Sequence, residues 1–405
     1  MNGVTKIFQW LFTSVFLFPL LPLNVSSMLL VLTFLAALYV SFSKKEFTFK
    51  THFFYVPLML IGLYFLTSVL FGGNFYASWK EFERRAVLLA GPLLFMMRPS
   101  INVETLRKAS MAFILSSIVL SLLFIFLHIR HFIVEGISSD TYFFTLRTSF
   151  EKLTNVHPTY FSLFSGASVI LLTRQLLSKD LTSSMKWGII FFLLILSSGI
   201  VFSGARTSIV ATFLCVIILF LLKKRYTYLL FASLLILPLI YVGRDVIFTR
   251  FINFYDVLTG QMSIGTMGTS DRLTIFQCSL ELCKQHWLFG LGPLNIQSAL
   301  NGCYSIANPA LAIKHTYNTH NEYMNQLLSF GLLGIITLVA FIFCLLKNPK
   351  RLTLVFLLGV LFGLQFLTEN LLSRQHGLFT VCLVLGVFNR IDRSPDFKFW
   401  TLDSK

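Results

Sequence analysis

The amino-acid sequence predicts an all-α polytopic membrane protein with about twelve transmembrane helices. Composition is the first reason: of 405 residues, 56% are hydrophobic, only 12% are charged, and the mean hydropathy is +0.77. A soluble domain carries roughly twice that charged fraction. The second reason is a series of apolar runs long enough to cross a hydrocarbon layer of about 30 Å as helices. The alternating apolar and polar strands of a membrane β-barrel are missing.

The spans follow from the apolar runs between polar connections, and we expect residues 1–405 to form one integral membrane domain. The run 7–23 contains Pro19 and Pro22 and lacks a small-residue cleavage site, which favours a retained helix over a removable signal peptide. The run 86–97 is short and could be tilted, re-entrant or extended into its flanks. We expect spans at 7–23, 28–42, 53–71, 86–97, 109–129, 157–173, 187–203, 207–222, 226–242, 321–346, 352–368 and 375–389.

The distribution of basic residues predicts the orientation. A net charge of +16 could suit nucleic acid, but basic residues on membrane proteins chiefly set topology, and we expect no nucleic-acid partner. With a cytoplasmic N-terminus, the inner segments hold 20 of the 33 Lys and Arg residues, although the outer segments are much longer. This is the positive-inside pattern, which places both termini in the cytoplasm.

The outer cations are not required by topology. Their surplus of Arg suggests an anionic ligand, and phosphate matches the guanidinium fork best. The alternative is that several of them extend to lipid head groups. These cations are Lys80, Arg84, Arg85, Arg130, Arg147, Lys152, Arg206, Arg244, Arg250, Arg272, Lys284, Lys314 and Arg374.

One large outer loop, residues 243–320, separates the ninth and tenth spans and is too long to be a passive connector. Ser270 and Asp271 predict the start of a helix that runs to about Trp287. Its expected apolar side consists of Leu273, Phe276, Leu280 and Leu288. The Phe289–Pro293 stretch contains a Gly-Leu-Gly that is too short for a nucleotide fingerprint, so we expect a turn.

Three cysteines, Cys278, Cys283 and Cys303, fall in this loop, where conditions are oxidising. A spacing of five residues directs Cys278 and Cys283 to different sides of a helix, so we expect a disulfide from either one to Cys303. The spacing of His, Cys and acidic residues resembles neither a zinc site nor a divalent-metal site, and no metal or cofactor is expected.

His320 is the strongest candidate for chemistry, because it follows the long hydrophilic loop and opens the tenth span. The positive end of the helix dipole disfavours imidazolium there, so the ring can serve as a neutral base. Asn321 or Thr319 could cap the helix. Gly331 and Gly334 are three residues apart and permit close helix packing. The alternative is a capping or interfacial His above a packing helix.

Two arginines accompany it on the outer face. Arg206 lies in the short turn between the seventh and eighth spans, beside helix-start N–H groups that favour a phosphate. Arg272 lies on the first turn of the outer-loop helix. Interfacial anchoring of Arg206, or pairing of Asp271 with a nearby cation, is the alternative. Weaker candidates are Arg84, Arg85, Arg147 and His157. Together these residues suit transfer chemistry on a lipid-linked phosphate, in which Arg binds the pyrophosphate and a neutral base deprotonates a hydroxyl.

These residues resemble the O-antigen ligase and O-antigen polymerase superfamily of bacterial inner-membrane proteins. The ligase pattern is His, then Asn, Ser or Gln, nine residues, Gly, two residues, Gly, which His320, Asn321, Gly331 and Gly334 match. The stretch 203–207 resembles the family's Ser-Arg turn, with Ala205 in place of the usual Ser. Asp271-Arg272, Trp287 and the Gly290–Pro293 turn are similar to its large periplasmic loop, and His157-Pro158-Thr159 resembles a further element.

The resemblance implies a metal-independent glycosyltransferase with a GT-C-like membrane fold and a partly helical periplasmic loop. The donor is then a glycan on undecaprenyl pyrophosphate, and a ligase transfers it to a sugar hydroxyl of the lipid A core. His320 is carried over as the base or acceptor-orienting group, and Arg206 and Arg272 as diphosphate binders. Asn321, Arg84, Arg85 and Arg147 are expected to bind substrate, and membrane lipids surround the chain.

Two other functions remain open. A polymerase would join glycan repeats on the same carrier, but the paired Arg-x15-Gly pattern of polymerases does not fit, because Leu222 and Leu288 occupy the glycine positions. A flippase or transporter would carry ionisable residues within its spans, whereas here the spans are nearly free of charge.

Overall fold

The computed structural model describes residues 3–43, 53–71, 73–97, 101–136, 139–178, 181–228, 230, 269–313, 317–351, 353–394 and 397. Within these ranges every regular element is a helix and there is no strand, as the composition predicts. The ninth expected span, 226–242, and the first part of the outer loop, 243–268, lie almost wholly outside the described residues, as do Arg244, Arg250 and Lys314.

The helices follow the predicted runs closely along most of the chain. They are α1 (Gly3–Val15), α2 (Leu23–Ser43), α3 (Tyr55–Phe71), α4 (Phe75–Arg85), α5 (Val87–Met96), α6 (Val103–Ile129), α7 (Ser139–Thr154), α8 (Pro158–Leu176), α9 (Ser183–Ser203), α10 (Arg206–Leu222), α13 (Thr269–Gln285), α14 (Ile296–Ala307), α15 (Pro309–Ile313), α16 (Glu322–Leu346), α17 (Thr353–Gln365), α18 (Gln375–Phe379) and α19 (Leu385–Asp392). Short π-helical segments follow α6 (Arg130–Val134) and α18 (Thr380–Val384), and a 3-10 turn covers Leu371–Ser373.

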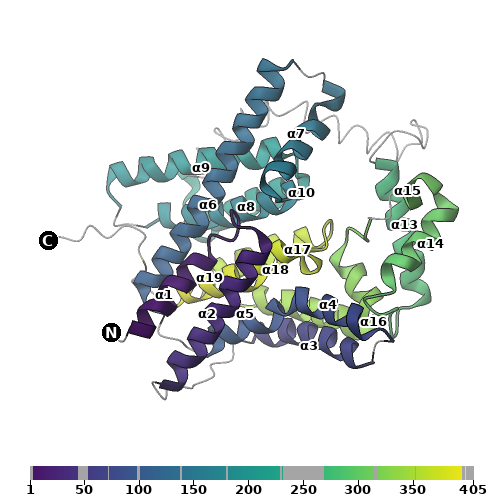
Figure 1. Cartoon of the computed structure of the whole chain (residues 1–405). Helices are drawn as coiled ribbons and strands as arrows, with labels where there is room; N and C mark the ends of the chain where they lie inside the picture. Colours follow the sequence, from purple (N-terminus) through teal and green to yellow (C-terminus); the bar gives the residue numbers. More distant parts are fainter. Residues whose placement is uncertain are drawn as a thin grey trace.

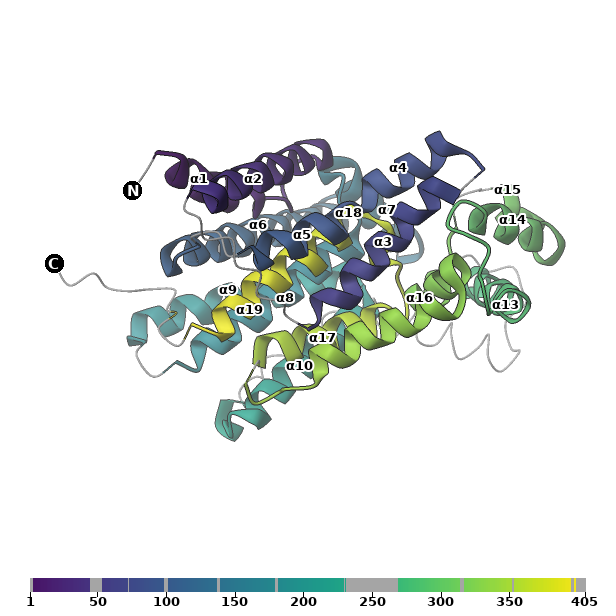
Figure 2. The same ribbon diagram turned by 90° about the horizontal axis from the view of Figure 1, so that it is seen from below.

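Helix α8 lies at the centre of the bundle, since nearly all of its residues are buried. It packs against α6, α9, α10 and α17, and its Gly166 allows close approach of Thr212 on α10. The start of α1 and the end of α19 lie at one end of the bundle, and α13–α15 lie at the other (Figures 1 and 2). The chain therefore has two chemically different ends, and the outer-loop helices mark one of them.

Among the described residues, four helices are long and apolar enough to cross a membrane: Leu23–Ser43, Val103–Val134, Ser183–Ser203 and Glu322–Leu346. Three shorter helices, α3, α10 and α17, are also apolar. Helical membrane architecture is thus confirmed in its coarse form, whereas the number twelve and a GT-C-like arrangement stay predictions.

The first expected span differs from the structure. The apolar run 7–23 is not one helix, because α1 ends at Val15 and a series of turns follows up to the start of α2. Pro19 and Pro22 explain the break, since proline lacks the N–H that a helix interior requires. The chain therefore folds back here, and α1 and α2 pack against each other.

The described part of the outer loop has a small core of its own. Ile275 and Cys283 of α13 pack with Leu300 and Tyr304 of α14, and Leu328 of α16 completes the cluster. A disulfide joins Cys278 to Cys303, one of the two pairings that the sequence leaves open, and Cys283 is free and buried. The bridge fastens α13 to α14.

The expected apolar side of α13 was wrong. Helix α13 buries Ile275, Cys278 and Ser279, a stripe at helical spacing that a search for Leu and Phe overlooks because two of its members are Cys and Ser. The predicted apolar residues are instead exposed: Leu273, Phe276, Leu280 and Leu288.

Helix α16 differs from a single regular span because it is broken at Gly331, which has φ 61° and ψ −147°. In a regular helix the Leu332 N–H would donate to the Leu328 carbonyl. Here the Leu332 N–H donates to Leu288 O at 3.1 Å, and Leu291 N–H donates to Leu328 O at 2.6 Å. The turn that follows α13 is therefore hydrogen-bonded into the break.

Both glycines of the pattern serve this break rather than helix packing in the membrane. A Cβ on Gly331 would lie 2.1 Å from Leu288 O, and one on Gly334 would lie 2.3 Å from Gln326 O. Gly290, with φ 74°, approaches from the other side, since its Cβ would lie 2.7 Å from Leu328 O. Only glycine fits these contacts, because each places backbone against backbone.

We expect Gly331→Ala to release the outer loop from α16. Backbone strain costs about 1–3 kcal/mol at such a φ and ψ, and the Cβ clash adds to it. Limited proteolysis of the purified protein should show faster cleavage around the 288–291 turn and a lower melting temperature. Gly363→Ala is the matched control, since its Cβ would meet no atom closer than 3.6 Å. Equal protection in both variants would contradict the docking role.

Candidate functional site

Arg206 is placed by a tightly built turn between α9 and α10. Gly204 ends α9 in the left-handed conformation at φ 62°. The Ala205 N–H donates to the Ser203 hydroxyl at 3.2 Å, and Arg206 begins α10 at once. Arg147 of α7 donates to the Ser203 carbonyl at 3.1 Å. The turn thus holds two arginines from different helices close together.

His320 stands immediately before α16 with φ 45°, a left-handed conformation that is uncommon for a residue with a side chain. Its N–H donates to the Asn318 side chain at 3.0 Å. Asn321 is the N-cap, because its side chain accepts from Met324 N–H at 3.1 Å. Capping is therefore done by the neighbour, and the His320 ring is left for another role.

The segment that follows α17, residues 366–370, forms hydrogen bonds with the residues around His320. The Glu322 N–H donates to Phe366 O at 2.8 Å, and the Asn321 amide donates to Leu367 O at 3.3 Å. The Asn370 side chain donates to the Thr319 hydroxyl at 3.0 Å. Residues 366–370 therefore fix the backbone on both sides of His320.

Glu369 of this segment faces the His320 ring. Its Oε2 lies 3.7 Å from Nδ1 of His320, and their side chains are 13% and 29% exposed. Nδ1 itself is buried and makes no hydrogen bond within the described structure. The distance is longer than a hydrogen bond, but such contacts tighten when substrate binds. A proton on Nδ1 directed at Glu369 leaves Nε2 as the basic nitrogen.

The Glu369 carboxylate is held in its charged form. Burial on its own raises the pKa, but the facing His320 and the positive charge of Arg272 outweigh it, so the pKa lies below the ordinary value. The Thr159 hydroxyl lies 3.5 Å from its other oxygen. Glu369 is thus a stable anion inside a positively charged site.

Three arginines from three elements form an electropositive cluster. Burial, together with the charges of Arg272 and Arg206, lowers the pKa of Arg147 to about 10 against the opposing effect of Glu369. Burial and Arg272 likewise lower the pKa of Arg206. Because these guanidinium groups destabilise one another, an anion between them would be strongly stabilised.

His157, a weaker candidate in the sequence, also lies in this cluster. It caps α8, and its Nδ1 accepts from Thr159 N–H at 3.3 Å. Burial and then the charge of Arg147 lower its pKa to about 4, with Arg374 and His320 acting in the same direction. His157 is therefore neutral at pH 7.

Arg84 and Arg85, which are expected to bind substrate, lie on α4. Arg84 is exposed and pairs with Glu81 at 3.0 Å. Arg85 also pairs with Glu81, and its guanidinium stacks over the Phe65 ring. Both side chains thus have structural partners on α3 and α4.

The most informative residue that we did not single out from the sequence is Glu369. A signal for it exists, since it is the only acidic residue between 352 and 391 and lies in the polar turn between two apolar runs. Among the described residues, no three His, Cys, Asp or Glu side chains are close enough together to hold a metal ion. The chemistry of the site is therefore that of arginines, histidines and one carboxylate.

Residues 191–339 match a protein-family model described as O-antigen ligase. This match covers 149 of the 405 residues, and it shows that this part of the chain is similar to the O-antigen ligase family. No curated protein matches the chain. The matched segment runs from within α9 to the part of α16 beyond its break. It includes Arg206, Arg272, His320, Gly331 and Gly334, whereas Arg147, His157 and Glu369 lie outside it.

An O-antigen ligase needs a group that binds an anionic leaving group and a group that accepts a proton. The cluster of Arg147, Arg206 and Arg272 can supply the first, and the His320–Glu369 pair can supply the second. The structure brings five of the predicted residues together and adds Glu369 to them: Arg147, His157, Arg206, Arg272 and His320.

Proposed function

We propose that the chain is an O-antigen ligase that transfers a glycan from undecaprenyl pyrophosphate to a sugar hydroxyl of the lipid A core. The observation that carries the proposal is the Glu369-facing His320 beside the cluster of Arg147, Arg206 and Arg272. A base and a polyanion site at one helix end are the two functions that this reaction combines.

The reaction is a displacement at the anomeric carbon of the donor. The acceptor hydroxyl oxygen forms the new bond to this carbon, and its proton passes to Nε2 of His320. The bond between the anomeric carbon and the pyrophosphate oxygen breaks, and its electron pair leaves with the pyrophosphate. The arginines stabilise the negative charge that develops there, so the proposed reaction needs no metal ion.

Glu369 would hold the His320 ring with Nδ1–H directed at its carboxylate. It would also stabilise the imidazolium that forms when the ring accepts the proton. Arg206 and Arg272 would bind the diphosphate from two different helices. Arg206 lies at the start of α10, and Arg272 lies on the first turn of α13. Arg147 and Asn321 would complete the substrate site, Asn321 by fixing the start of α16.

The proposed setting is the bacterial inner membrane, with the termini in the cytoplasm and the site at the periplasmic surface. The positive-inside count supports this orientation. The disulfide between Cys278 and Cys303 also supports it, because disulfides persist in an oxidising compartment such as the periplasm.

A polymerase acting on the same lipid carrier is the second candidate, because it would need the same diphosphate cluster and an acceptor base. Deletion of the gene separates the two functions. Loss of a ligase should leave long glycans on the carrier lipid and bare lipid A core. Loss of a polymerase should leave cores that carry a single repeat, and this ladder would contradict the ligase proposal. A flippase would not need the His320–Glu369 pair. If the chain were a flippase, the purified protein should show no glycan transfer.

We expect His320→Ala to lower kcat for glycan transfer by at least about 100-fold, because it removes the general base. Glu369→Gln should lower kcat by at least about tenfold with little change in KM, because it leaves the diphosphate cluster intact. The assay uses purified protein, carrier-linked glycan and lipid A core, in the presence of EDTA. Glu104→Gln, at the far end of α6, is the matched acidic control. Full activity of His320→Ala would eliminate the base role.

We expect Arg206→Lys to lower kcat/KM by about tenfold or more, although the positive charge is retained. Lysine cannot form the paired hydrogen bonds that a guanidinium makes to phosphate oxygens. Arg130→Lys, an exposed arginine paired with Glu135, should leave transfer nearly unchanged. Wild-type kinetics in Arg206→Lys would remove Arg206 from the diphosphate site.

A further inference from the structure

A second positively charged site lies at the other end of the helices that build the first. Helix α8 (Pro158–Leu176) is preceded by His157 and carries Arg174 in its last turn, and α10 (Arg206–Leu222) is followed by Lys223. Nineteen residues of α8 span about 28 Å, close to the thickness of a hydrocarbon layer. The two sites are thus separated by one membrane thickness.

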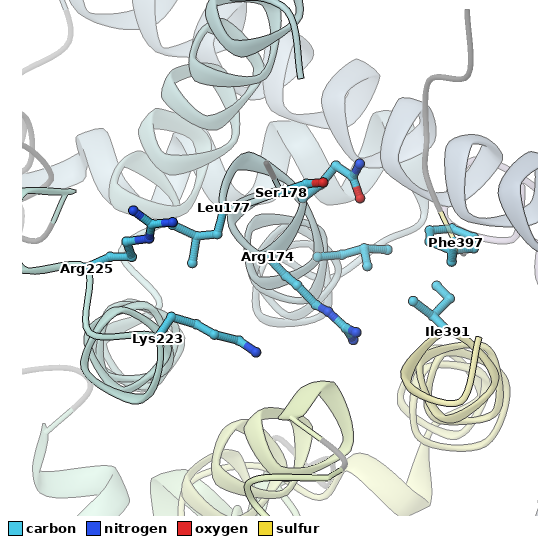
Figure 3. A pocket seen from close by; sticks show the side chains of 9 residues that line it. Arg174, Leu177, Ser178, Lys223, Arg225, Ile391 and Phe397 are labelled. Carbon is cyan, nitrogen blue, oxygen red and sulfur yellow. The ribbon is translucent and has the colours of Figure 1, made fainter. Parts of the chain in front are cut away.

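A cavity of about 340 Å³ lies between the ends of α8, α10 and α19. Arg174, Lys223 and Arg225 line it, and Ile391 and Phe397 contribute apolar walls (Figure 3). Figure 3 shows the Lys223 and Arg174 side chains extending into the space between the helices. The volume is within the range of about 300–1,000 Å³ that small-molecule sites occupy.

The positive charge of the cavity is only partly neutralised. Arg174 pairs with the buried Asp392. The same carboxylate also accepts from Leu354 N–H at 2.8 Å and Val355 N–H at 3.1 Å. Asp392 is therefore fully engaged by Arg174 and the start of α17. Among the described residues, Lys223 and Arg225 form no ion pair, so two positive charges face the cavity without a carboxylate.

Topology alone does not account for this arrangement. Lys223, Lys224 and Arg225 are all exposed, so each can reach water at the membrane surface as orientation requires. Lys223 and Arg225 differ from Lys224 because they also line a cavity with Arg174 of another helix. Basic pockets between helices on the cytoplasmic side are suited to phosphate-bearing lipid head groups.

The lipid-facing surface beside the cavity fits such a ligand. Leu221, Leu222 and Tyr226 flank Lys223 and Arg225 in the chain and are exposed, at 47%, 41% and 61%. An acyl chain could lie along this apolar surface while the phosphate enters the cavity. We propose that the cavity lined by Arg174, Lys223 and Arg225 binds the phosphate of an anionic phospholipid head group.

The test measures binding to the purified full-length protein in a neutral detergent, without any transfer reaction. The probes are dioctanoyl phosphatidylglycerol, dioctanoyl phosphatidylcholine and inorganic phosphate, followed by native mass spectrometry and by the melting temperature. We expect phosphatidylglycerol to bind and to raise the melting temperature. The double variant Lys223→Gln/Arg225→Gln should bind it about 25-fold more weakly, since each cation near anionic lipid is worth about fivefold.

Lys224→Gln is the matched control, because it removes one charge from the same turn without touching the cavity, and it should bind within about twofold of the wild type. If inorganic phosphate binds as tightly as phosphatidylglycerol and is lost in the same double variant, the shared phosphate chemistry stands and the ligand is a free anion. Equal binding of phosphatidylcholine, or unchanged binding in the double variant, would overturn the proposal. Neither result depends on glycan transfer, so the outcome is independent of the ligase hypothesis.

Discussion

The exchange of backbone hydrogen bonds at Gly331 is the constraint on which the site depends. Leu328 gives up its helical partner and accepts from Leu291, while Leu332 donates to Leu288. This exchange joins α16, whose start follows His320, to the turn after α13, the helix that carries Arg272. The disulfide and the small core between α13 and α14 stiffen the loop side of the joint. In the proposed reaction, a diphosphate bound by Arg272 would thereby be kept at a fixed position relative to His320.

The second support comes from the segment after α17, which fastens the His320 corner to the centre of the bundle. Thr368 contacts Thr207 through their hydroxyls at 2.9 Å, and Gln365 donates to Ser208. The same segment carries Glu369 and Asn370, which contact His320 and Thr319. Residues 365–370 therefore contact the starts of both α10 and α16, and they fix the positions of Arg206 and His320 relative to each other.

Much of this could be predicted from the sequence, because apolar periodicity and Gly or Pro punctuation act locally. Such local rules predicted helices α8, α10 and α17. They also predicted that Cys303 is one partner of the disulfide. The break in α16 did not, because a helix interrupted by an incoming turn has the same apolar pattern as an unbroken one. The buried face of α13 was missed because Cys and Ser pack there in place of Leu. Glu369 was missed because its partner lies 49 positions earlier in the chain, and one sequence does not report such a contact.

The charge pattern around His320 explains why one acidic residue belongs in a site built to hold an anion. The arginines that favour a bound diphosphate also oppose any positive charge that arrives on the ring. A proton transferred from the acceptor hydroxyl would create such a charge among Arg147, Arg206 and Arg272. Glu369 lies beside the buried Nδ1, where it would offset that opposition and leave Nε2 to the acceptor hydroxyl. In the proposed reaction, the carboxylate would therefore let one small region combine an anion site with a base.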